Sequence, residues 1–75
     1  MAPVPLMSGR AVGKAFFERL GWIKVRQSGS HIILVREGHI ATLSVPNHQQ
    51  VAKGTLRSLI RAAGLTVEDF LEATK

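Results

Sequence analysis

The chain has no cysteine and only five acidic residues, and these two shortages limit what it can be. Without thiols it cannot form disulfides or cysteine metal sites, which fits a reducing compartment such as the cytoplasm. No apolar run approaches the roughly 20 residues that a membrane-spanning helix needs. Residues 1–7 lack the charged and apolar regions of a signal peptide. We interpret them as a loose leader, followed by one small domain over residues 8–75.

The few acidic residues are also unevenly placed. Three of the five, Glu68, Asp69 and Glu72, lie in the last eight residues, so residues 1–67 carry nine basic and two acidic side chains, or 9 − 2 = +7. A positive field of this kind attracts polyanions and speeds their encounter with the protein. The charge therefore predicts a nucleic acid, RNA or DNA, as partner. The alternative is a solvated basic surface that only aids solubility.

Helical spacing of apolar residues marks two longer helices and a short one. The first follows Ser8 as a possible N-cap and stops at Gly21, and the second carries an apolar stripe that ends at Gly64. Thr66 is placed to cap a short acidic helix. The pattern predicts that the first two helices pack on a sheet.

The second helix carries Lys53, Arg57 and Arg61 on its other side, four residues apart. Its start is the positive end of the helix dipole, where backbone N–H groups and a lysine suit a phosphate. We predict RNA contacts from these three cations, with an ordinary solvated helix face as the alternative.

Between the two helices, β-branched residues from Trp22 to Val45 predict three antiparallel strands joined by hairpins at Ser28-Gly29 and Glu37-Gly38. These turn centres would place six residues on an apolar face toward the helices: Ile23, Val25, Ile32, Leu34, Ala41 and Leu43. The same register would put Arg26 directly across from His31 on the opposite face, with Lys24 on a diagonal and Ser44 on the third strand.

The opposite face of this predicted sheet would also carry large apolar residues, namely Trp22, Ile33, Val35 and Ile40. Contiguous apolar surface with a charged margin is typical of a protein-binding site. Packing of the leader or of the C-terminal segment over this face is the alternative.

The predicted order, a helix, three antiparallel strands, a helix and a short extra helix, defines an α+β fold like that of double-stranded RNA-binding domains. Four segments together resemble the HicA family of bacterial toxins: Gly21-Trp22, Arg26 to His31, Val45-Pro46 and Lys53 to Leu65. The resemblance runs from Ser8 to Leu71. It implies an mRNA interferase of a toxin-antitoxin system, paired with a HicB antitoxin, in which His31 is the catalytic histidine. Many members have a second histidine where this chain has Ile32, so no role is carried over to that position.

A single histidine can cleave RNA, because the 2′-hydroxyl of the ribose is the nucleophile. Arg26 and Lys24 are candidates to offset the charge at phosphorus, and Ser30 or the Gly29 backbone to position a phosphate. The leaving oxygen could take its proton from water, His48 or His31. Three scattered histidines without nearby carboxylates do not form a metal site, and no cofactor is expected.

Two classes of function therefore remain. The first is a metal-independent endoribonuclease toxin acting on mRNA. The second is a non-catalytic RNA-binding module that uses Lys53, Arg57 and Arg61. DNA binding through the second helix is less favoured, since no helix-turn-helix pattern precedes it.

Overall fold

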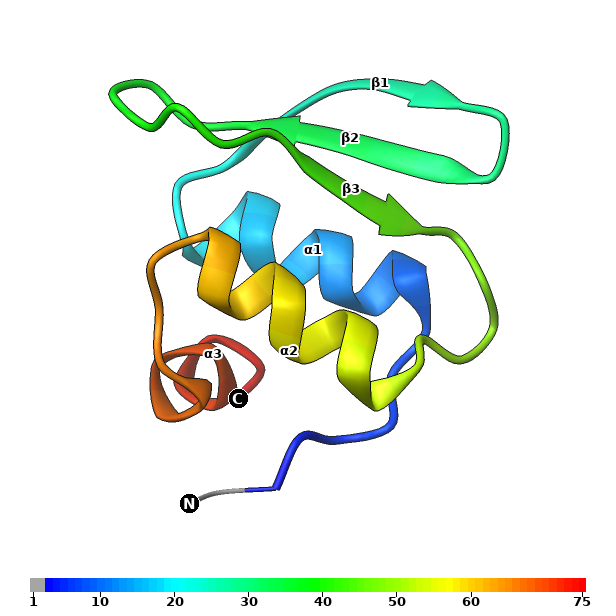
Figure 1. Ribbon diagram of the computed structural model, residues 1–75, viewed down its shortest axis with the longest axis vertical. Helices are drawn as coiled ribbons and strands as arrows, with labels where there is room; N and C mark the ends of the chain where they lie inside the picture. Colours follow the sequence, from blue (N-terminus) through cyan, green and yellow to red (C-terminus); the bar gives the residue numbers. More distant parts are fainter. Residues whose placement is uncertain (1–2) are drawn as a thin grey trace.

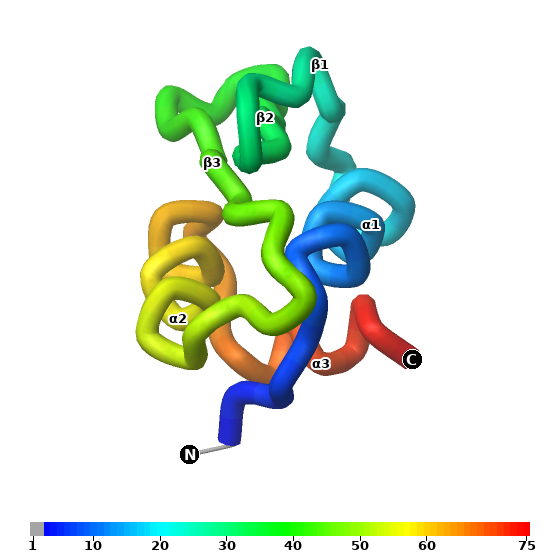
Figure 2. Tube along the Cα trace, turned by 90° about the vertical axis from the view of Figure 1, so that its right-hand side faces the viewer, coloured from blue at the N-terminus to red at the C-terminus, as the bar shows by residue number. Residues whose placement is uncertain are grey.

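A computed structural model describes residues 3–75 of the chain. It contains six elements in the order α1 (Gly9–Arg19), β1 (Ile23–Ser28), β2 (His31–Val35), β3 (Leu43–Pro46), α2 (Lys53–Ala62) and α3 (Val67–Ala73). The strands form an antiparallel sheet in the order β1-β2-β3. Helices α1 and α2 lie under the same face of the sheet, and α3 lies beneath both helices (Figures 1 and 2). The predicted α+β class and element order are confirmed.

Local capping interactions fix the helix ends. The Ser8 side chain accepts a hydrogen bond from the Ala11 N–H at 3.1 Å and starts α1. Gly64 follows α2 with a φ of 76°, a left-handed conformation that favours glycine. A reciprocal capping box between Thr66 and Asp69 starts α3. These three signals act within a few residues, which is why the sequence predicts them.

One hydrophobic core joins the sheet to the helices. Phe16 of α1 lies at its centre, with its ring centroid 6.1 Å from that of Trp22 and 5.4 Å from that of Phe70. The other buried apolar residues include Val12, Ile32, Leu34, Leu43, Val45, Val51, Leu56, Leu59 and Ile60. No helix in the part of the chain that the structure describes is long and apolar enough to span a membrane.

Residues 3–7 belong to this packed domain. Val4 is only 2% exposed, and the Met7 carbonyl accepts a hydrogen bond of 2.7 Å from the Val51 N–H. The interpretation of a loose leader is therefore wrong for these five residues, because an apolar side chain and a backbone bridge attach them to the core. Met1 and Ala2 lie outside the described residues.

The sheet register differs from the predicted one at both turns. The first turn is Gly29-Ser30, so Ser28 lies across from His31 where Arg26 was expected. The second connection is a longer loop over residues 36–42, so Leu34 lies across from Leu43 and Ala41 is not in a strand. Both shifts move the pairing by an even number of residues. The predicted faces of β2 and β3 are therefore preserved.

A β-bulge between Lys24 and Arg26 changes the faces of β1. It adds Val25 as an extra residue, so Lys24 pairs with buried Leu34 on the side of the helices and Ile23 pairs with Val35 on the outer face. Ile23 is 53% and Val25 51% exposed. The prediction that both residues contribute to the core is therefore wrong, and the bulge is the reason.

Trp22 is also misplaced by the prediction. It is 1% exposed, because it precedes β1 and turns into the core, where its ring lies 5.1 Å from that of His39. Ile40, expected beside it on a strand, is fully exposed in the 36–42 loop. Of the four predicted apolar residues of the outer face, Ile33 and Val35 remain there.

Candidate functional site

His31 is the first residue of β2 and is exposed on the outer face of the sheet, between Ser28 of β1 and Pro46 of β3. The Asn47 N–H donates to the Ser30 carbonyl at 2.6 Å, which ties the end of β3 to the first hairpin. The Gly9 N–H donates to the His48 carbonyl at 2.8 Å, which ties the same loop to the start of α1. His31 therefore lies next to a region where backbone hydrogen bonds link the first hairpin, the end of β3 and the start of α1.

One of the two predicted cations lies near this histidine. Arg26 pairs with Ile33, so it occupies the next outward position along β1 from Ser28. Such a diagonal neighbour on an antiparallel sheet is about 7–8 Å away, within the reach of an arginine side chain. Lys24 lies on the opposite face because of the bulge, so the predicted diagonal contact with His31 is wrong.

The remaining polar residue proposed to lie near His31 is Ser30. It is exposed in the turn next to His31, and its carbonyl is already used by Asn47. Its hydroxyl has no hydrogen bond within residues 3–75. The structure thus brings His31, Arg26 and Ser30 to the end of the sheet at the first hairpin.

The electrostatics of this region are set by unpaired cations. Over residues 3–75 the one ion pair joins Lys75 Nζ and Glu72 Oε1 at 3.4 Å, at the C-terminal end of the chain. Arg26 therefore has no acidic side chain paired with it in the described residues and can contact an incoming anion. The described part of the chain holds no cluster of three histidine or acidic side chains that could bind a metal ion.

The other two histidines occupy different environments. His39 is half-buried against Trp22, and its Nδ1 accepts a hydrogen bond from the Ala41 N–H at 3.2 Å, which suits a structural role. His48 is exposed in the loop after β3, where its backbone carbonyl receives the Gly9 N–H.

The basic side of α2 is exposed as predicted. The three cations Lys53, Arg57 and Arg61 are all exposed. The buried side of this helix is formed by Leu56, Leu59 and Ile60. The N-cap residue of α2, Ala52, provides no side-chain hydrogen bond, so backbone N–H groups of the first turn remain open.

No segment within residues 3–75 covers the outer face of the sheet. Residues 3–7 reach Val51, and α3 contacts α1 and α2, so neither end of the described chain covers this face. Its apolar residues are the half-buried Ile33 and Val35 together with the exposed Ile23. Sequence alternation missed Ile23, because no local pattern reveals the bulge that turns it outward.

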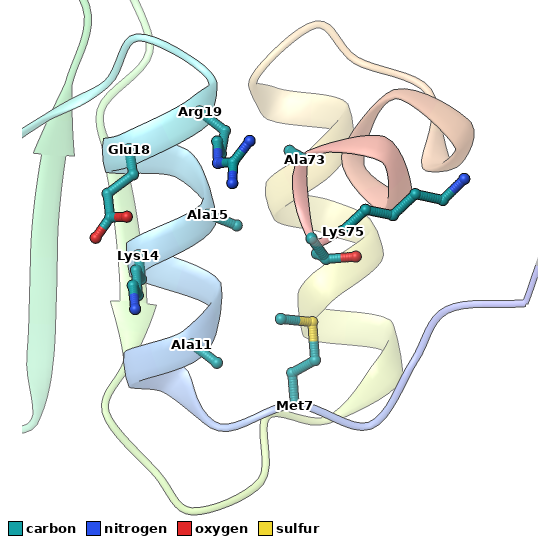
Figure 3. Close-up of a pocket in the computed structure, with 9 residues that line it drawn as sticks. Met7, Ala11, Lys14, Ala15, Glu18, Arg19, Ala73 and Lys75 are labelled. Carbon is teal, nitrogen blue, oxygen red and sulfur yellow. The ribbon is translucent and has the colours of Figure 1, made fainter.

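Two hollows lie away from His31. One, of about 290 Å³, lies between α1 and the C-terminal end of the chain. Ala11 and Ala15 of α1 point toward it, Met7 points into it from the N-terminal segment, and Arg19 lies at the end of α1 beside it (Figure 3). The other lies between α1 and β1, and Lys24 lines it.

These features define a small basic α+β domain whose fold is like that of double-stranded RNA-binding domains, with an exposed histidine at one end of the central strand. The family model that describes the HicA toxin of bacterial toxin-antitoxin systems matches residues 14–65, which is 52 of 75 residues. The chain belongs to this family. The match includes the whole sheet, His31 and α2. Among curated proteins, none matches the chain as a relative.

Proposed function

We propose that this member of the HicA toxin family is a metal-independent endoribonuclease that cleaves mRNA. The observation that carries the proposal is the exposed position of His31, on an open sheet face with Arg26 as its diagonal neighbour. Family membership supplies the toxin class. The net charge of +5 on 75 residues supports a polyanionic substrate.

In this mechanism the imidazole of His31 takes the proton from a ribose 2′-hydroxyl, whose oxygen attacks the adjacent phosphorus in line. The bond from phosphorus to the 5′ oxygen of the next nucleotide breaks, and that oxygen takes a proton from His31, from His48 or from water. An imidazole can accept and donate a proton near neutral pH. Arg26 offsets the charge that develops on the phosphoryl oxygens, and the Ser30 hydroxyl donates to one of them.

A HicB-type antitoxin would neutralise the toxin in the cytoplasm by covering this face. The apolar contact would come from Ile33 and Val35, with the exposed Ile40 of the 36–42 loop and acidic partner groups against Arg26. Trp22, although predicted for this surface, is too deeply buried to take part while the fold is intact.

A competing proposal is a non-catalytic RNA-binding module that uses Lys53, Arg57 and Arg61, which are exposed on one side of α2. His31→Ala separates the two. The nuclease proposal predicts a loss of about 10² to 10⁴ in the cleavage rate of a single-stranded RNA, with loss of growth arrest and unchanged RNA affinity.

Gln49→Ala, which changes an exposed polar residue of the neighbouring loop, is the control and should cleave like the wild type. His48→Ala tests whether His48 protonates the leaving oxygen: a partial loss assigns it that step. Equal cleavage by the wild type and by His31→Ala would refute the proposed mechanism.

A further inference from the structure

The groove between α1 and β1 lies on the helix-facing side of the sheet, away from His31, and has a volume of about 370 Å³. Strand β1 is one of the two edge strands of the sheet and lies above α1 in Figure 2. All six residues of β1 are exposed, so the strand overhangs the helix without closing the space below it. Ile32 and Leu34 form the apolar wall on the sheet side.

The bulge in β1 decides which side chain enters this groove. Without it, regular alternation from Arg26 would turn Val25 toward the helix and Lys24 outward. With it, Lys24 lies across from Leu34 and lines the groove. Bulges occur next to functional sites, where they redirect a side chain. Here the bulge turns Lys24 toward the helix, on the face where regular alternation would place the apolar Val25.

The helix side of the groove combines an aromatic ring with cations. Phe17 is 54% exposed at this groove, whereas the neighbouring Phe16 is completely buried. Arg10 and Lys14 lie on the same side of α1. Gly13 also lines the groove, where a Cβ would lie in ordinary van der Waals contact with Ile32 Cδ1, at 3.5 Å.

We propose that this groove binds one nucleotide of single-stranded RNA, with the base stacked on Phe17 and the flanking phosphates held by Lys24, Lys14 and Arg10. An exposed aromatic ring beside a positively charged groove is the arrangement that proteins use for unpaired bases. Three cations and one acidic residue, Glu18, line the groove, so its net charge is 3 − 1 = +2. A duplex has its bases stacked internally and cannot offer one to Phe17.

As a substrate site, the groove rests on the proposed nuclease function. Lys24 is paired with Leu34, and His31 is three residues earlier on β2, about 10 Å along the strand. RNA that leaves the groove around the free edge of β1 would pass Arg26 before it reaches His31. Binding in the groove would thus hold the strand on one side of the bond to be cut.

The test is RNA binding by fluorescence anisotropy, with His31→Ala as the parent protein so that the probe is not cut. The probe is a short fluorescein-labelled oligouridine, compared with a labelled RNA duplex at the same salt concentration. Phe17→Ala should weaken oligouridine binding by about 5-fold to 100-fold, and Phe17→Trp should restore it. Leu6→Ala, at an apolar position 62% exposed and outside the groove, should bind like the parent.

Lys24→Gln should weaken binding and reduce the slope of log affinity against log salt by about 0.7. Lys75→Gln removes the same charge at the C-terminal end and should leave that slope unchanged. Unchanged affinity of Phe17→Ala with an intact fold, or a Phe17-independent preference for the duplex, would overturn the groove proposal. Cleavage by the wild-type protein is measured separately. If the protein does not cleave RNA, the binding measurements therefore still test the groove.

Discussion

Two glycine-to-alanine substitutions should have opposite effects on stability, because only one of the two glycines faces another segment. Gly9 begins α1, and a Cβ at this position would overlap the Pro46 carbonyl oxygen and lie 2.8 Å from Asn47 Cα. Gly54 lies in the first turn of α2, where a Cβ would meet nothing within 4 Å. The added methyl group would therefore collide with backbone atoms at position 9, whereas it would point into solvent at position 54.

The expected magnitudes follow from these contacts. Carbon atoms prefer separations of about 3.5 to 4.0 Å, so α1 and the end of β3 would have to move apart by roughly 1 Å. Overpacking costs about 1 to 3 kcal/mol, and loss of the hydrogen bond from the Gly9 N–H to the His48 carbonyl adds about 1 kcal/mol. Gly9→Ala should thus lower the free energy of unfolding by about 2 to 4 kcal/mol. Gly54→Ala should raise it by up to about 1 kcal/mol through helix propensity.

Urea unfolding followed by the fluorescence of Trp22 measures both effects, since this single tryptophan is buried in the core. A chain of 75 residues has an expected stability of about 4 to 11 kcal/mol, so the Gly9 substitution would remove a large part of it. The Tm should fall by roughly 10 to 30 °C. Surface substitutions typically change the free energy of unfolding by less than about 0.5 kcal/mol. A change this small for Gly9→Ala would contradict the close approach of α1 to the end of β3.

Three further predictions test other parts of the molecule. Ile33→Glu places a charge on the outer face and should weaken an antitoxin complex in pull-down titrations, while the urea midpoint stays near that of the wild type. Trp22→Ala, in the core, should instead lower the free energy of unfolding by about 3 to 5 kcal/mol. The pKa of Asp69 is lowered, first by the hydrogen bond from the Thr66 N–H and then by that from the Thr66 hydroxyl, so its stabilising contribution is present above its ordinary pKa of 3.8 and lost as the pH falls below it. The stability difference between the wild type and Asp69→Asn should therefore shrink in urea titrations as the pH is lowered through this range. Glu18→Gln should tighten oligouridine binding in the groove, because it removes the acidic side chain nearest to the proposed phosphates.

The helices were predictable because their signals are local. Ser8, Thr66 and Gly64 act on backbone groups only a few residues away, and the apolar stripe of α2 needs no knowledge of its partners. The faces of β2 and β3 were predictable for a similar reason, since alternation of apolar residues survives a register shift of two positions. His31 was placed on the outer face by this alternation.

The sheet edge could not be derived in the same way. Which two residues form the first turn depends on the whole hairpin, and Gly29 with a φ of 58° takes the position expected for Ser28. Trp22 is buried through ring contacts with Phe16 and His39. The alternation of residues along a strand does not reveal these contacts. Val4 likewise has no periodic signal in the sequence. It is buried because it packs in the core cluster with residues far from it in the chain.

The bulge at Val25 connects the two proposed surfaces of the toxin. One extra residue turns Ile23 outward, next to Val35 on the proposed antitoxin face, and turns Lys24 inward, into the groove with Phe17. Arg26 stays outward beside His31, because it lies on the turn side of the bulge. An edge strand with regular alternation would keep Lys24 and Arg26 on one face and leave the groove without its sheet-side cation. The irregularity therefore separates the cation proposed for catalysis from the cation proposed for substrate binding, within three consecutive residues.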